Sequence, residues 1–134
     1  MNKKNINLYI LKASGRLTKY AREIKGTFDA VLRKVCQKIP ISDIDVVVYD
    51  DQYGYNIIPE LGIGGHTYSP NSVFIYLDPK FPNFLDTTIR EELERTLAHE
   101  FNHAARWQTV GYGTTLLEAM ISEGVGRPFR YGDK

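Results

Sequence analysis

The sequence predicts an α+β domain, and two patterns support this prediction. Runs rich in β-branched and aromatic residues at 6–11, 44–49 and 72–77 are typical of short strands. Two longer segments, 17–39 and 93–104, repeat apolar residues every three or four positions, as amphipathic helices do. This order predicts a small mixed sheet with a long backing helix, a second long helix and a short C-terminal helix. We expect residues 1–134 to form a single domain, because a chain of this length usually does.

The first part of the chain is expected to hold one strand and the backing helix. After strand 6–11, Ser14 and Gly15 predict a turn. The helix that follows begins near Leu17 and ends before Pro40, because the residue preceding a proline disfavours helical backbone. Cys36 lies at helical spacing among apolar residues, so we interpret it as a small buried hydrophobic residue.

The middle of the chain is expected to complete the sheet. Segment 44–49 predicts a buried strand, and 56–58 could form a short one. The glycines in 62–65 predict a turn, where the backbone can bend or lie close to another strand. Segment 72–77 is the clearest strand, and because it is the last before the next helix we take it as the edge strand.

The second long helix is expected to begin at a capping box and to bury one face. Thr88 and Glu91 form the Thr-x-x-Glu pattern that satisfies two backbone donors at a helix start. The apolar stripe consists of Leu93, Leu97, Phe101 and Ala104. The side chains of His99 and His103 fall on a strip beside this stripe, where they can face a cleft.

Residues 99–103 read His-Glu-Phe-Asn-His, which is the H-E-x-x-H pattern. Histidines four positions apart on a helix lie one above the other, so His99 and His103 can bind one Zn²⁺ ion. Glu100 then lies beside the metal, where it can act as a general base toward water. A catalytic zinc ion takes three protein ligands and keeps one open position, so a third ligand must come from elsewhere.

The spacing of the acidic residues resembles that of the thermolysin-like (gluzincin) metallopeptidases, whose third zinc ligand is a glutamate on the next helix. This resemblance implies Glu123, which follows His103 by 20 positions. Glu118 competes for the same role, although with Thr115 it completes a second capping box that would give it a structural task. We favour Glu123 and keep Glu118 as the alternative.

Several segments also resemble a bacterial family of predicted zinc-dependent proteases of undefined substrate. They are 96–106 and 117–124, with Gly-Ile-Gly-Gly at 62–65 and Tyr-Leu-Asp-Pro at 76–79. The resemblance covers roughly residues 60–125. It implies a minimal zincin-like metallopeptidase that hydrolyses peptide bonds with one zinc ion and the motif glutamate as general base.

Such a reaction also needs a group that stabilises the developing oxyanion. The candidates are Tyr112, His66, Arg106 and Tyr131. Arg106 could instead pair with Glu123 or Glu118 and orient that carboxylate. As in zincin-type peptidases, we expect an extended peptide or protein substrate to pair with the edge strand 72–77 through main-chain hydrogen bonds.

Two other functions would use the same metal site. A zinc amidase acting on a non-peptide or cell-wall substrate would differ only in the shape of its cleft. A zinc-stabilised interaction module without turnover would fill all four coordination positions with protein ligands, for example with His66 as the fourth.

The composition limits which binding partners and which cellular compartment we expect. The 17 Lys and Arg residues nearly balance 16 Asp and Glu residues, so charge gives no reason to expect binding to nucleic acid or anionic membranes. The single cysteine excludes an internal disulfide. No run approaches the roughly 20 apolar residues of a membrane span, and segment 6–11 is too short for a signal peptide. We therefore expect a soluble cytoplasmic protein.

Overall fold

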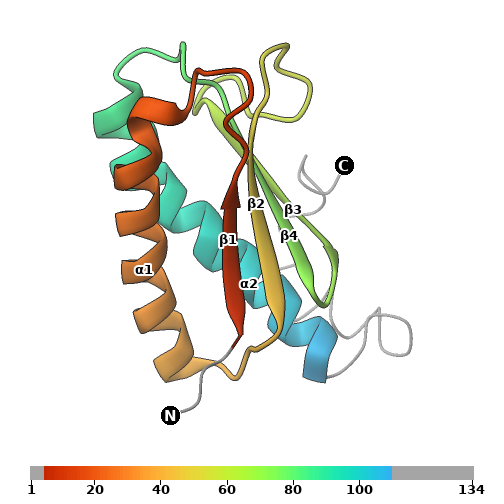
Figure 1. The fold of residues 1–134 in the computed structure, drawn as a ribbon. Helices are drawn as coiled ribbons and strands as arrows, with labels where there is room; N and C mark the ends of the chain where they lie inside the picture. Colours follow the sequence, from red (N-terminus) through yellow and green to blue (C-terminus); the bar gives the residue numbers. More distant parts are fainter. Residues whose placement is uncertain (1–4, 110–134) are drawn as a thin grey trace.

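The computed structural model describes residues 5–109, in which two helices cover one face of a four-stranded sheet (Figure 1). The elements in chain order are β1 (Ile6–Ile10), η1 (Thr18–Tyr20), α1 (Ala21–Lys38), β2 (Ile44–Asp50), β3 (Ile63–Ser69), β4 (Ser72–Leu77), η2 (Phe84–Glu92) and α2 (Leu93–Thr109). This arrangement confirms the predicted α+β class. The predicted C-terminal helix falls outside the described residues.

The strand order places β4 inside the sheet. The order is β1-β2-β4-β3, in which β1, β2 and β4 run parallel and β3 runs antiparallel to β4. The prediction of an edge strand at Ser72–Leu77 is therefore wrong. The physical reason is that β3 and β4 form a hairpin whose second strand pairs with β2, which leaves the first strand, β3, on the outside.

The edge strand β3 occupies the segment that was predicted to be a glycine-rich turn. Gly62 makes a turn with a φ of +72°, but Gly64 and Gly65 lie within the strand. A Cβ atom at Gly64 would lie 1.9 Å from the carbonyl oxygen of Asn56. Glycine is needed here because the preceding loop, which pairs with the strand at Ile58 and Ile63, lies directly against it.

The backing helix α1 follows the predicted bounds closely. A 3₁₀ turn at Thr18–Tyr20 leads into the α-helix, so α-helical backbone begins slightly later than the predicted start at Leu17. The helix ends at Lys38, and the backbone of Ile39 is extended before Pro40, as predicted. Cys36 is partly buried and packs against the core. No helix within residues 5–109 is long and apolar enough to cross a membrane.

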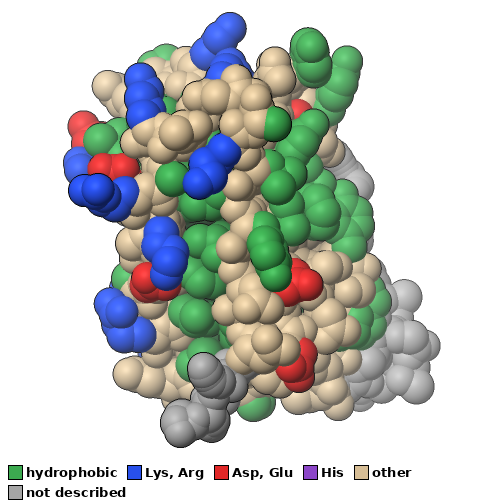
Figure 2. Space-filling view, in the orientation of Figure 1, with side chains coloured by type: hydrophobic (Ala, Val, Ile, Leu, Met, Phe, Trp, Pro, Cys, Tyr) green, Lys and Arg blue, Asp and Glu red, His purple; other side chains and the backbone are tan. Residues whose placement is uncertain are grey.

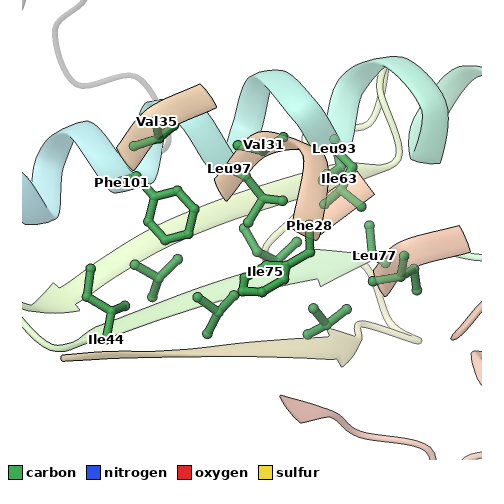
Figure 3. Close-up of a cluster of buried hydrophobic side chains, with 14 of the residues drawn as sticks. Phe28, Val31, Val35, Ile44, Ile63, Ile75, Leu77, Leu93, Leu97 and Phe101 are labelled. Carbon is green, nitrogen blue, oxygen red and sulfur yellow. The ribbon is translucent and has the colours of Figure 1, made fainter. Parts of the chain in front are cut away.

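The hydrophobic core lies between the two helices and the sheet (Figure 3). It includes Ile24, Phe28, Val31 and Val35 of α1, Ile44, Val46 and Val48 of β2, Val73, Ile75 and Leu77 of β4, and Leu93, Leu97, Phe101 and Ala104 of α2. All four residues of the apolar stripe predicted for the second helix are thus buried. Their burial fixes which side of α2 faces the sheet.

The start of α2 differs from the prediction. A π-helical segment, η2, precedes α2 and begins directly after Asn83, which has a φ of +56°. Thr88 lies inside η2 rather than at a helix start, and its buried hydroxyl donates to the carbonyl oxygen of Leu61 at 3.0 Å. The prediction of a capping box at Thr88 and Glu91 is therefore wrong, because the threonine hydroxyl donates to a distant segment of the backbone.

Aromatic side chains cover the sheet face that points away from the helices. The ring of Tyr68 lies 5.1 Å from that of Phe74, and the hydroxyls of Tyr68 and Tyr76 are 2.7 Å apart. Burial, together with this hydrogen bond, raises the pKa of Tyr76. Figure 2 shows a band of hydrophobic side chains on the sheet side of the molecule and Lys and Arg side chains over the α1 side.

Candidate metal centre

Two histidine rings of α2 converge on one point. His99 and His103 are one helical turn apart, and the burial of the neighbouring apolar stripe directs the helix so that His99 is exposed and His103 half-buried. Their Nε2 atoms lie 3.1 Å apart, and their ring planes meet at 84° with centroids separated by 4.6 Å. The two nitrogens therefore face each other across a short gap.

This separation suits two ligands of one tetrahedral metal ion. Nitrogen ligands bind zinc at about 2.0–2.1 Å, so two of them at a tetrahedral angle lie roughly 3.3–3.4 Å apart. Neutral imidazole is also a common ligand of zinc. His99 and His103 thus fit two corners of a zinc site with only a small movement of either ring.

The carboxylate between the two histidines in sequence faces the sheet. Glu100 is only 4% exposed. Because a glutamate is rarely buried without polar partners, a hydrogen-bond donor is expected near it. The hydroxyl of Thr67 on β3 lies 2.7 Å from Oε1 of Glu100 and 3.1 Å from its carbonyl oxygen. The motif glutamate is therefore held between its own helix and the edge strand.

Gly65 makes room for this contact. A Cβ atom at Gly65 would lie 2.8 Å from Cγ2 of Thr96 and 3.1 Å from Oε2 of Glu100. A side chain on this residue would push α2 and the glutamate away from the strand. The glycine thus lets α2 approach β3 closely at the residue that carries the carboxylate.

Both candidates for the third ligand fall outside the part of the chain that the structure describes. Glu118 and Glu123 both lie beyond residue 109, as do Tyr112 and Tyr131. Within residues 5–109, no three His, Cys, Asp or Glu side chains form a group that could hold a metal ion. The choice between the two glutamates therefore stays a prediction.

The two remaining described candidates, Arg106 and His66, differ in how they are placed relative to the histidine pair. Arg106 follows His103 by three positions on α2 and so lies on the same side of the helix. His66 lies on β3 next to Thr67, and its ring is 4.2 Å from that of Tyr68. Because neighbouring strand residues point to opposite faces and Thr67 points at α2, the structure directs His66 away from the histidine pair.

Two residues near Glu100 were not singled out from the sequence. Thr67 is one of several polar residues in 66–69, and nothing local distinguishes it from its neighbours. Gly65 was predicted to lie in a turn or close to another strand, whereas it lies within β3 and its close neighbours are side chains of α2. A sequence signal was present only in the two-residue spacing of Gly65 and Thr67, which places both on one face of a strand.

Comparison with known proteins identifies the family of the chain. No curated protein and no solved structure matches the chain significantly. A family model described as "Predicted Zn-dependent protease (DUF2268)" matches residues 24–132, which include both histidines, Glu100 and both candidate third ligands. This match covers most of the chain, and the chain therefore belongs to this family of predicted zinc-dependent proteases.

Proposed function

We propose that this protein hydrolyses peptide bonds with one zinc ion bound by His99, His103 and Glu123. The observation that carries the proposal is the pair of Nε2 atoms 3.1 Å apart on the helix that also buries Glu100. The family description supports zinc dependence and proteolysis. Glu118 is the alternative third ligand.

The chemistry assigned to Glu100 follows from its place beside the histidine pair. Zinc at this site would act as a Lewis acid, which lowers the pKa of water and polarises a carbonyl group. Glu100 would accept a proton from the water molecule whose oxygen forms the new bond to the carbonyl carbon. It would then return that proton to the amine nitrogen as the carbon–nitrogen bond breaks. Of the oxyanion candidates that the structure describes, Arg106 lies on the same side of α2 as His103, and we assign it this role.

We place the extended substrate along β3 instead of β4. Among the described residues, β3 pairs with β4 on one side and has only the bridge of Ile58 and Ile63 on the other. Gly65 and Thr67 of this strand face Glu100, so a peptide paired with its outer side would pass close to the carboxylate. Main-chain pairing of this kind gives affinity without requiring a particular sequence.

Zinc content and hydrolysis of the 134-residue chain test this proposal. We would measure zinc by equilibrium dialysis and hydrolysis with fluorescently labelled casein for the wild type, Glu100→Gln and Glu123→Ala, with Glu118→Ala as the matched control. Glu100→Gln should keep zinc and lose turnover, because it retains the shape of the side chain but not its basicity. Glu123→Ala should lower zinc affinity by at least about a hundredfold, whereas Glu118→Ala should retain it.

The possible outcomes separate the parts of the proposal. Full turnover in Glu100→Gln would remove the assigned mechanism. Loss of zinc in Glu118→Ala but not in Glu123→Ala would exchange the third ligand and leave the reaction intact. A wild type that binds zinc tightly with no hydrolysis would favour the interaction module instead of an enzyme.

A further inference from the structure

We infer that Thr67, at the edge of the sheet, is a positioning residue that orients the carboxylate of Glu100 for proton transfer. This inference rests on the proposed function and deepens it. It concerns a residue outside the H-E-x-x-H motif and on a different element, β3. The observation behind it is the 2.7 Å contact between the Thr67 hydroxyl and Oε1 of Glu100.

The hydrogen bond has a defined direction. A threonine hydroxyl carries one proton, and two acceptors of Glu100 lie within reach: Oε1 at 2.7 Å and the carbonyl oxygen at 3.1 Å. The carboxylate is the nearer acceptor, and a hydrogen bond to a charged acceptor is the stronger one. The proton is therefore donated to Oε1, and the side chain of Glu100 is held at one of its two oxygens.

The sheet fixes the position of the donor. Thr67 pairs with Val73 of the interior strand β4, and the side chain of Val73 is fully buried. Threonine is branched at Cβ and has few side-chain conformations, so a fixed backbone also restricts the hydroxyl. The donor is thus held in place before any substrate arrives, as preorganised catalytic sites require.

Gly65, on the same strand as Thr67, also lies against the carboxylate of Glu100. Oε2 of Glu100 lies over this glycine, where a Cβ atom would be only 3.1 Å from it. Gly65 and Thr67 are two positions apart and face the same side of β3. One residue leaves space beside Oε2 and the other donates a hydrogen bond to Oε1, so the edge strand lies against both oxygens of Glu100.

Three variants separate positioning from stability. Thr67→Val keeps the shape of the side chain and removes the donor, and Thr67→Ser keeps the donor. Thr88→Val is the matched control, because the Thr88 hydroxyl also makes a hydrogen bond across elements, to Leu61, but lies on η2 and contacts neither Glu100 nor the histidines in the contacts described above. Both valine variants should lower the thermal midpoint, so stability alone cannot explain a difference in turnover.

The first measurement is turnover of labelled casein by the zinc-loaded protein. Thr67→Val should lower kcat by about tenfold or more with little change in KM, which is the size expected for one lost hydrogen bond to a charged group. Thr67→Ser should restore most of kcat, and Thr88→Val should leave kcat unchanged. Equal losses of kcat in Thr67→Val and Thr88→Val, or no loss in Thr67→Val, would overturn the inference.

The second measurement does not depend on activity. The side-chain carboxyl carbon of Glu100 can be followed by ¹³C NMR in metal-free protein, with its resonance assigned from its loss in Glu100→Gln. Thr67→Val should shift this resonance, whereas Thr67→Ser and Thr88→Val should leave it near its wild-type position. An unshifted resonance in Thr67→Val would overturn the inference even if the enzyme is active. If the wild-type protein hydrolyses nothing and the resonance still shifts in Thr67→Val, the proposed function is refuted but Thr67 still orients Glu100.

Discussion

The guanidinium of Arg16 and the carboxylate of Asp50 form a two-point ion pair. Nε of Arg16 lies 2.8 Å from Oδ2 of Asp50, and Nη2 lies 2.7 Å from Oδ1. The hydroxyl of Ser14 also donates to Oδ2 at 2.6 Å. These contacts hold the segment after β1 against the end of β2. The hydrogen bonds from Arg16 lower the pKa of Asp50 and outweigh the opposing effect of its burial.

This pair predicts a pH-dependent contribution to stability. Asp50→Asn should lower the free energy of unfolding at pH 7 by about 2–3 kcal/mol, because it leaves a partly buried guanidinium with only the more distant carboxylate of Asp78, at 3.8 Å. The folded pKa lies below the unfolded value of about 3.9, so the stabilisation is present above that pH and is lost as pH falls through the folded pKa. Urea unfolding at pH 7, 5, 3 and 2 should show the stabilities of the wild type and the variant converging in acid.

An exposed ion pair provides the control for Asp50. Asp29 pairs with Lys25 at 3.0 Å on the surface of α1, where both side chains are well exposed. Asp29→Asn should change the free energy of unfolding by less than about 0.5 kcal/mol at every pH. A difference between wild type and Asp50→Asn that stays constant down to pH 2 would contradict the prediction.

The second prediction concerns the histidine pair. His103→Ala should lower zinc affinity by at least about a hundredfold, because it removes one of two nitrogens that face each other at 3.1 Å. His66→Ala is the matched control, since the ring of His66 contacts Tyr68 on the other face of the sheet. Competition with a fluorescent zinc indicator measures both affinities. A loss in His66→Ala equal to that in His103→Ala would mean that His66 belongs to the metal site after all.

The third prediction tests why glycine occurs within the edge strand. Gly64→Ala should lower the free energy of unfolding by at least about 2 kcal/mol, because the new Cβ atom would meet the carbonyl oxygen of Asn56 at 1.9 Å. Gly26→Ala, on the exposed side of α1 with nothing within 4 Å, should instead raise it by about 0.5–1 kcal/mol. Thermal and urea unfolding of both variants should give opposite signs. A stable Gly64→Ala would indicate that the loop before β3 moves aside at little cost.

The fourth prediction concerns the end of α2. The side-chain amide of Gln108 donates to the carbonyl oxygens of Ser42 and Pro70, each at 2.8 Å. Gln108→Met keeps the length of the side chain but leaves both carbonyls without this donor, so the free energy of unfolding should fall by about 1–3 kcal/mol. Gln37→Met, at an exposed position of α1, should change it by less than about 0.5 kcal/mol. Equal effects of the two substitutions would show that the Gln108 contacts contribute nothing.

The regular elements with strong apolar patterns were predictable from the sequence. The strands β1, β2 and β4 and the buried stripe of α2 lie where alternation and helical spacing placed them. The strand β3 was not predictable in this way, because Gly64 and Gly65 are poor strand formers by propensity. They occur there because neighbouring segments come too close for any side chain, and this requirement is visible only once those segments are in place.

The predictions of the helix start and of the edge strand were wrong for a related reason. The Thr-x-x-Glu pattern at Thr88 is a local signal, but the hydroxyl bonds to Leu61, 27 positions earlier in the chain. The position of Ser72–Leu77 in the sheet depends on which strand of a hairpin pairs with β2. Near-continuous burial of this strand, with Tyr76 only 7% exposed, is the mark of an interior strand, but burial is a result of folding.

The sequence by itself determined the feature on which the proposed function depends, the facing nitrogens of His99 and His103. A helix places residues four apart on one side through its own backbone geometry, so this arrangement needs no distant partner. Only the tertiary structure decided that β3 is the outer strand and that Thr67 donates to Glu100, 33 positions away. Contacts of that range depend on how strands pair across the sheet, and the pattern within a single strand does not specify its neighbours.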